Sequence, residues 1–73
     1  MFTYKHLRTE VMSAMENKPK QWRNGQFVFN YIDEKYCVAR IAQFEKNVDC
    51  FYDDNKIEEF IKTCAEILND YEH

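Results

Sequence analysis

The last third of the chain carries the pattern that most restricts its fold. Six apolar side chains recur there at spacings of three and four residues: Ile57, Phe60, Ile61, Cys64, Leu68 and Tyr71. This spacing places them on one face of a helix, and such a face must be buried against other elements. Asp54 or Asn55 is expected to cap this helix, and Asn55 with Glu58 has the spacing of a capping box. Glu58 and Lys62 are spaced as an exposed ion pair.

Residues 3–17 show the same helical spacing. Their apolar positions are Tyr4, Leu7, Val11 and Met15. Thr3 has the side chain of an N-cap residue. Pro19 is expected to end this helix, because the residue before a proline avoids the α region, and the same proline suits the first turn of a new helix.

Residues 20–34 fit two structures. Asn24-Gly25 is a strong hairpin dipeptide, and aromatic side chains alternate after it as they would in a strand. A helix is favoured, because a set of large and small residues falls on one helical face: Trp22, Gly25, Val28, Phe29, Ile32 and Tyr36. A glycine inside a helix usually marks a close helix–helix approach, which we expect at Gly25.

Residues 35–45 are also predicted to form a short helix. Cys37, Ile41 and Phe44 would share its apolar face, with Arg40 and Gln43 lying away from that face. The alternative is a β-hairpin over residues 37–52 that turns at residues 45–47, where Asn47 tolerates a positive φ. Residues 48–53 are expected to be extended in either structure.

The predicted fold is mainly α: one small globular domain over residues 1–73, built as a compact bundle of three or four short helices. One extended segment, residues 48–53, would be pinned across the helices by Phe51. A chain with one glycine and one proline favours regular structure with short connections. The alternative is an α+β fold with the hairpin at 37–52. A core of this size leaves little room for a closed active site.

Charge and cysteine content restrict the class of partner. The net charge is −3, with +3 over residues 1–24 and −6 over residues 25–73. Duplex nucleic acid is disfavoured, because its binding requires a strong basic stripe, whereas a polarised chain can steer a charged partner or pair with itself. Three cysteines without a CxxC motif, and no long apolar run, indicate a cytoplasmic protein with reduced thiols and no membrane span.

Two blocks of the sequence resemble a known family. They read Trp22-Arg23-x-Gly25-Gln26-x-x-Phe29-Asn30 and Asp49-x-Phe51-Tyr52-Asp53-Asp54-x-x-Ile57-x-x-Phe60. The chain is similar here to a family of short, uncharacterised bacterial and phage proteins that have no assigned activity. The resemblance covers about half of the chain and implies helices over 20–34 and 55–71. It also implies an accessory protein of a prophage or another mobile element.

Polar residues within these blocks indicate a structural contact. Gln26 and Asn30 are four residues apart and share a helical face, from which they are expected to hydrogen-bond the backbone of the extended segment. We call the predicted set the latch: Gln26, Asn30, Asp49, Phe51, Asp53 and Asp54. The alternative is that Gln26 and Asn30 grip the amide or base edge of a ligand.

The sequence disfavours two kinds of reactive site. Asp49, Asp53, Asp54 and Glu58 could form a metal cluster, but they lack the glycine and alternating ligands of a calcium loop, and helix capping explains Asp53 and Asp54. The thiols match no catalytic signature, and the two histidines are too isolated in the sequence to serve as zinc ligands: Cys37, Cys50, Cys64, His6 and His73. The sequence therefore predicts no metal, no other cofactor and no enzyme.

The candidate binding residues combine aromatic rings with guanidinium groups: Trp22, Arg23, Tyr31, Arg40 and Tyr52. Such residues dominate protein interfaces, and they also stack bases and hold phosphates, while some of them could simply be core or solvated. The leading hypothesis is a non-enzymatic protein that binds a partner protein. The alternative is an oligomeric sponge that sequesters a nucleotide signal. A chain this rich in aromatic residues is expected to form a homo-oligomer.

Overall fold

The computed structural model describes residues 3–71, and within that range the chain is helical without any strand. The α-helices are α1 (Tyr4–Ala14), α2 (Asn24–Tyr36), α3 (Ala39–Glu45) and α4 (Ile57–Tyr71). The 3-10 turn η1 (Met15–Asn17) follows α1 directly, and the 3-10 turn η2 (Asp54–Lys56) leads into α4. The mainly-α prediction is confirmed, and the alternative hairpin at 37–52 is wrong for this structure.

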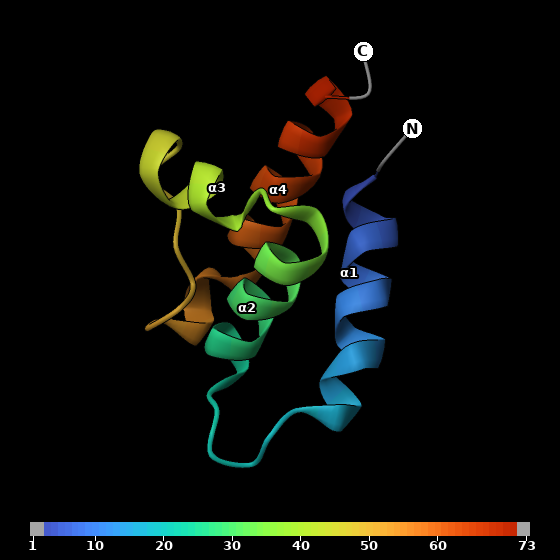
Figure 1. Ribbon diagram of the computed structural model, residues 1–73, viewed down its shortest axis with the longest axis vertical. Helices are drawn as coiled ribbons and strands as arrows, with labels where there is room; N and C mark the ends of the chain where they lie inside the picture. The colour runs from blue at the N-terminus through green and yellow to red at the C-terminus, as the bar shows by residue number, and fades with distance from the viewer. Residues whose placement is uncertain (1–2, 72–73) are drawn as a thin grey trace.

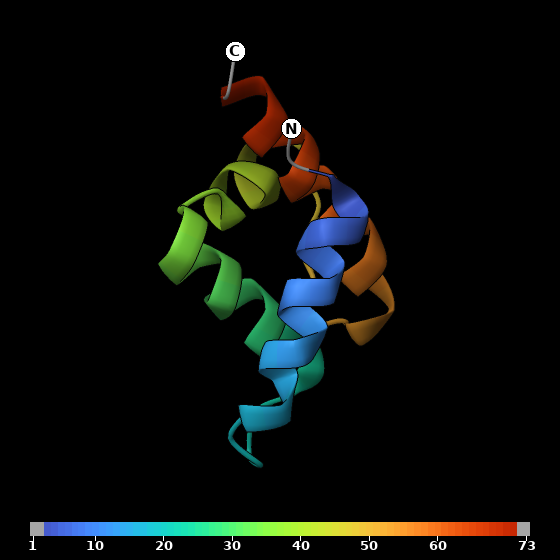
Figure 2. The ribbon, with the colours of Figure 1, turned by 90° about the vertical axis from the view of Figure 1, so that its right-hand side faces the viewer.

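The helices form one bundle. Figure 1 shows α1 and α4 running in opposite directions, so that the start of α1 and the end of α4 lie at the same end of the molecule. Helix α2 packs against both of them, and α3 contacts α2 and α4. Figure 2 shows α2 and α3 together on one side of α1. The extended segment then returns from α3 to the start of α4 (Figure 1).

The core draws side chains from all four helices and from the extended segment. Its fully enclosed members include Leu7, Val11, Val28, Ile32, Ala42, Cys50, Phe60, Ile61 and Cys64. The predicted apolar stripes of α1, α2 and α4 are therefore confirmed over most of their length. The stripe of α4 fails at its end, where Ile67 is buried and Tyr71 is 66% exposed. The last turn of α4 projects past the ends of the other helices (Figure 1), which agrees with the exposure of Tyr71.

The boundaries of α1 follow the sequence, whereas the start of α2 does not. The Thr3 hydroxyl accepts a hydrogen bond from the His6 amide at 3.1 Å, as expected of an N-cap. The chain is extended at Lys18, just before Pro19, so the proline ends the first helical segment. Pro19 does not open α2, however. Its carbonyl accepts from the Trp22 amide in a turn, and α2 begins five residues later.

The junction of α2 and α3 corrects the predicted helix at 35–45. Cys37 adopts the left-handed conformation, and its amide bonds back to α2, which ends there. Val38 and the two alanines of α3, Ala39 and Ala42, make the buried face. Cys37 is exposed and Phe44 is 77% exposed, so the expected apolar face of this segment is wrong. Small alanines let α3 lie close to the bundle and turn its phenylalanine outward.

A half-buried carboxylate, that of Glu10, joins α1 to α2, and residue spacing did not predict this contact. Glu10 accepts hydrogen bonds from the hydroxyls of Tyr31 and Tyr36, both at 2.6 Å, and from the Lys35 ammonium. Burial opposes ionisation of Glu10, but hydrogen bonds from Lys35 and the two tyrosines outweigh it and lower its pKa to about 2. This cluster fixes α1 against α2 through charge-assisted contacts.

A second polar contact joins α1 to α4. The Glu58 carboxylate pairs with Arg8, 2.9 Å from its Nε, and accepts from the Tyr4 hydroxyl. Glu58 is therefore engaged across the bundle, rather than by Lys62 or in a capping box with Asn55 as predicted. Spacing along one helix did not reveal that α1 lies within reach of this side chain.

Candidate functional site

The start of α2 touches the extended segment at its backbone. A Cβ atom on Gly25 would lie 2.0 Å from the Cys50 carbonyl oxygen and 3.0 Å from a carboxylate oxygen of Asp54. Only a residue without a side chain fits between these groups. The predicted close approach at Gly25 is real, but its neighbour is the extended segment and not another helix.

Three hydrogen bonds hold that contact. The Gly25 amide donates to the Asp54 carboxylate at 2.8 Å, and the Cys50 thiol donates to the Gly25 carbonyl at 3.3 Å. Nη2 of Arg23 lies 3.4 Å from the Phe51 carbonyl oxygen. The N-cap position of α2 is Arg23, whose side chain has no acceptor, so Asp54 supplies the missing acceptor from a distant part of the chain.

The predicted hydrogen bonds from Gln26 and Asn30 to the extended segment are wrong, and the backbone of Gly25 makes the contact instead. Gln26 accepts from the Arg23 amide at 3.4 Å within α2, and no hydrogen bond of the described residues joins Gln26 or Asn30 to the extended segment. Both side chains are half-buried on α2, and Gln26 bonds at the start of its own helix. The backbone of Gly25 performs the role assigned to them, which sequence spacing could not show.

The aspartates of the latch act on backbone amides and on one side chain. Asp49 accepts from the Phe51 amide at 2.8 Å and from the Gln43 side chain at 2.9 Å. Asp53 accepts from the Asn55 amide at 2.9 Å and so caps η2, the turn that leads into α4. These bonds shape the extended segment and tie it to α3.

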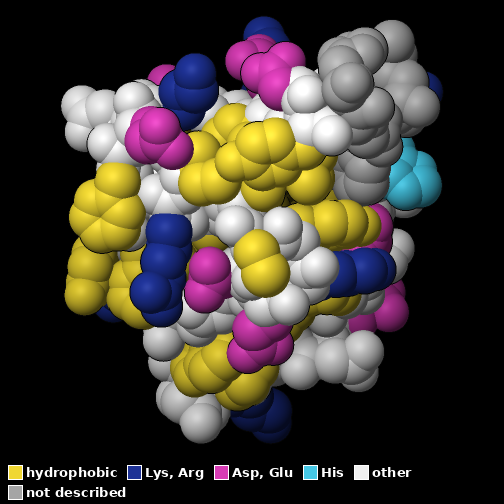
Figure 3. Space-filling view, turned by 45° about the horizontal axis from the view of Figure 1, so that its top comes forward, with side chains coloured by type: hydrophobic (Ala, Val, Ile, Leu, Met, Phe, Trp, Pro, Cys, Tyr) yellow, Lys and Arg dark blue, Asp and Glu magenta, His cyan; other side chains and the backbone are white. Residues whose placement is uncertain are grey.

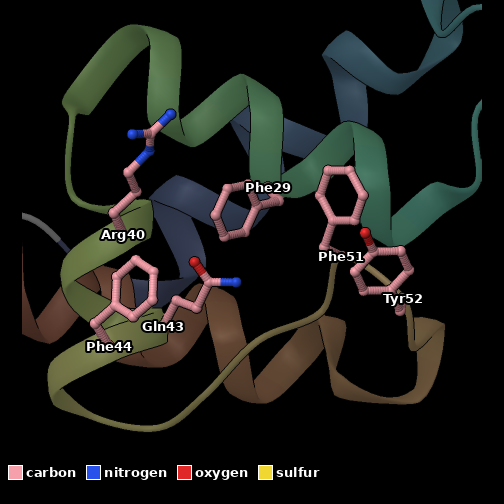
Figure 4. A pocket seen from close by; sticks show the side chains of 6 residues that line it. All are labelled: Phe29, Arg40, Gln43, Phe44, Phe51 and Tyr52. Carbon is pink, nitrogen blue, oxygen red and sulfur yellow. The ribbon is translucent and has the colours of Figure 1, made fainter.

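A groove opens between α3 and this segment. Its volume is about 270 Å³, and its lining residues are Phe29, Arg40, Gln43, Phe44, Phe51 and Tyr52. Figure 4 shows Arg40 and Phe44 of α3 at one end, Phe51 and Tyr52 at the other, and Phe29 of α2 between them. The groove is therefore built from three parts of the chain that are distant in sequence.

Aromatic packing holds two of the lining rings in place, whereas two others are exposed. The Phe29 ring stacks on Phe60 in the core at 5.5 Å, and the edge of Phe51 meets Phe29 at 5.6 Å. Tyr52 packs against Phe51 at 4.7 Å but is itself 77% exposed, the same fraction as Phe44. Phe51 thus pins the segment as expected, and two exposed aromatic rings flank the groove.

Two arginines stand at the groove. The Arg40 side chain is 73% exposed, and its Nε lies 3.8 Å from Asp33, too far for a hydrogen bond. The Arg23 guanidinium lies 5.3 Å from the centre of the Tyr52 ring, a cation–π contact just outside the groove. Carboxylates, thiols and imidazoles are missing from the six lining side chains, so the groove offers aromatic surface and a cation rather than acid–base groups.

The structure divides the candidate binding residues into two groups. Arg40 and Tyr52 line the groove, and Arg23 contacts it through Tyr52. Trp22, in the turn before α2, and Tyr31, within α2, instead both pack against Phe27, with ring centres 6.5 and 5.9 Å from it. The set does not converge on one site, because Tyr31 is turned toward Glu10 on α1.

Phe44 and Gln43 line the groove although the sequence did not predict them as binding residues. Helical spacing gives Arg40, Gln43 and Phe44 a common face, but Phe44 was predicted to lie on the buried face with Cys37 and Ile41. The alanines Ala39 and Ala42 were the available signal. A face of small residues can pack as closely as a face of large ones.

None of the carboxylates, thiols and imidazoles considered as reactive groups lines the groove. Among residues 3–71, no group of three or more metal-ligating side chains could hold an ion. Desolvation raises the pKa of the buried Cys50 and Cys64 thiols to about 12, whereas Cys37 is exposed. Cys37 is therefore the thiol of the three that solvent can reach. His6 lies on the exposed surface of α1, and His73 lies outside the described residues.

The surface carries apolar groups among mixed charges. Figure 3, which looks at the end where α1 begins and α4 ends, shows hydrophobic side chains in several groups separated by basic and acidic ones. Within the described part of the chain, no helix has the length and apolar character that a membrane span requires.

Comparison of the chain with protein-family models, with curated proteins and with solved structures finds no match. The resemblance to short bacterial and phage proteins stays a prediction, and function must be argued from the groove.

Proposed function

We propose that the protein is a non-enzymatic binding protein that acts by holding a partner protein at the groove between α3 and the extended segment. The observation that carries this is the exposure of Phe44 and Tyr52, each 77%, at opposite ends of a groove of about 270 Å³. Monomeric proteins rarely leave clustered large apolar side chains in water without a binding role.

The lining residues suit an apolar anchor from the partner. Phe29 and Phe51 are fixed by ring contacts to the core, so the hollow exists before binding and needs little reorganisation. The volume equals that of about nine water molecules at ~30 Å³ each, enough for one large side chain. Arg40, which has no hydrogen bond to Asp33, supplies a cation beside it. Aromatic residues and arginine are the usual hot spots of interfaces.

The setting of this activity belongs to the same proposal. Three cysteines without a disulfide support a cytoplasmic location, where thiols stay reduced. The resemblance to phage and bacterial proteins supports an accessory role in a mobile element. A small protein of this kind would act by occupying a surface of its partner.

A photo-crosslinking amino acid placed at position 44 tests the proposal in cells. Tyr71 provides the matched control position, because it is also an exposed aromatic residue but lies outside the groove. We expect crosslinking at 44 to recover a protein that crosslinking at 71 does not. With the purified partner, Phe44→Ala should weaken binding at least 10-fold, as truncation of a hot-spot residue does, and Tyr71→Ala should not. Identical recoveries at 44 and 71 would refute the proposal.

A nucleotide ligand is the second candidate, favoured by one observation. Arg40 and Tyr52 line the same groove, and Arg23 lies over the Tyr52 ring, so a base could stack while a guanidinium holds a phosphate. Titration calorimetry with a panel of cyclic and ADP-ribose-type nucleotides tests this candidate. Heat that is lost in Arg40→Ala would support it, and absence of heat with every member would remove it.

A further inference from the structure

The groove has an exposed aromatic ring, Phe44, at one end. Phe44 projects from α3 at one end of a hollow whose far end is formed by Phe51 and Tyr52 (Figure 4). One surface therefore presents both an exposed ring and a cavity able to receive such a ring. A surface of this kind can pair with itself about a two-fold axis, since each copy then gives and receives the same side chain.

The charges around the groove also favour self-pairing. Both signs occur at the groove: Arg40 lines it with Asp33 3.8 Å away, Arg23 lies over the Tyr52 ring, and Asp49 accepts from the lining residue Gln43. A strongly one-signed rim would repel its own copy. The Arg40–Asp33 pair, at 3.8 Å, is loose enough for Arg40 to turn toward a carboxylate of another copy.

The available area indicates a weak dimer. A standard interface buries about 800 Å² per partner, which is about 16% of the 4911 Å² surface. Aromatic side chains bury ~150–250 Å² each, so the exposed 77% of Phe44 and Tyr52 supplies ~300 Å² per copy. The groove walls must supply the rest, and an interface at the lower end of the size range is expected.

We propose that the groove is filled by a second copy of this chain, with Phe44 of each copy seated in the hollow of the other. The site is then completed by a residue from the partner copy. This dimer forms whether or not another partner protein is present. One consequence rests on the proposed function: self-association and partner binding would compete for the same groove, so that the partner acts on the monomer.

Sedimentation equilibrium of the purified chain over ~2–500 µM tests the dimer without any partner. We expect a monomer–dimer equilibrium with a dissociation constant in the micromolar range. Phe44→Ala should raise that constant at least 10-fold, and Tyr71→Ala, the exposed aromatic control outside the groove, should change it less than twofold. Phe44 makes few contacts with its own chain, so the variant should keep its fold, which circular dichroism checks.

Isotope-filtered NOE measurements on a mixed labelled and unlabelled sample locate the contact. Contacts between Phe44 of one copy and Phe29 or Phe51 of the other support the proposal. A chain that stays monomeric at 500 µM would overturn it, as would a dimer weakened equally by Phe44→Ala and Tyr71→Ala. Dimerisation can fail while crosslinking at position 44 still recovers a partner, so the two proposals are separable.

Discussion

Replacement of Gly25 by alanine should separate the extended segment from α2. The new Cβ would lie 2.0 Å from the Cys50 carbonyl oxygen, a backbone atom that cannot rotate away. Restoring an ordinary contact of 3.4 Å moves this segment by about 1.4 Å. A shift of that size breaks the 2.8 Å hydrogen bond from Gly25 to Asp54 and loosens Phe51 against Phe29.

The energies of these losses can be compared with the gain from alanine. A hydrogen bond to a charged group contributes about 1.5–3 kcal/mol, and an aromatic edge contact about 0.5–1.5 kcal/mol. Alanine stabilises a helix interior by about 1 kcal/mol over glycine. Gly25→Ala should therefore lower the free energy of unfolding by about 1–3.5 kcal/mol, which for a domain of this size corresponds to a fall in Tm of ~5–25 °C.

Urea and thermal unfolding followed by circular dichroism measure this change. Asn24→Ala is the matched control, because Asn24 is the exposed residue beside Gly25 at the start of α2. Its free energy of unfolding should change by no more than ~0.5 kcal/mol. If Gly25→Ala is as stable as the wild type, or gains the ~1 kcal/mol expected from helix propensity alone, the contact between Gly25 and Cys50 does not exist in solution.

Three further results follow from the described contacts. The pKa of Glu10 is lowered to about 2, so its ionised form stabilises the fold above pH 4.5 and loses that effect as pH falls toward 2. Urea unfolding should show Glu10→Gln about 2–3 kcal/mol less stable at pH 7, with the gap closing by pH 2; a constant gap would contradict the mechanism. A thiol reagent should label Cys37 rapidly and reach Cys50 and Cys64 only in urea, whereas three fast thiols in the native protein would contradict their burial. At a protein concentration below the dissociation constant of the dimer, Phe44→Ala should leave the free energy of unfolding within ~0.5 kcal/mol, and a larger loss in chemical denaturation would mean that Phe44 is not exposed.

Periodic spacing predicted the helices well where one face is both large and continuous. In α1 and α4, Leu7, Val11, Phe60 and Ile61 are buried as their spacing requires. The same rule failed in α3, where a single helical turn separates Phe44 from Arg40 and alanines are buried instead. A helix of two turns has too few residues for spacing to decide which face is buried.

Polar contacts were predicted poorly, because most of them join distant parts of the chain. Glu10 lies outside the predicted apolar stripe of the first helix, yet it accepts hydrogen bonds from Tyr31, Lys35 and Tyr36 of α2. Asp54 was expected to cap its own helix and instead caps α2 at Gly25. Local spacing shows which partners a side chain has along one helix, but not which helix end lies beside it.

The sequence by itself determined that the chain is helical, where α1 and α4 lie, and that Gly25 needs space. Those properties depend on local backbone preferences and on the burial of apolar faces, which residue order encodes directly. The tertiary structure alone decided that Gly25 meets Cys50, that Asp54 caps α2, and that Phe44 and Tyr52 face one groove. These features arise from how the helices pack, and packing depends on the shapes of all the buried side chains together.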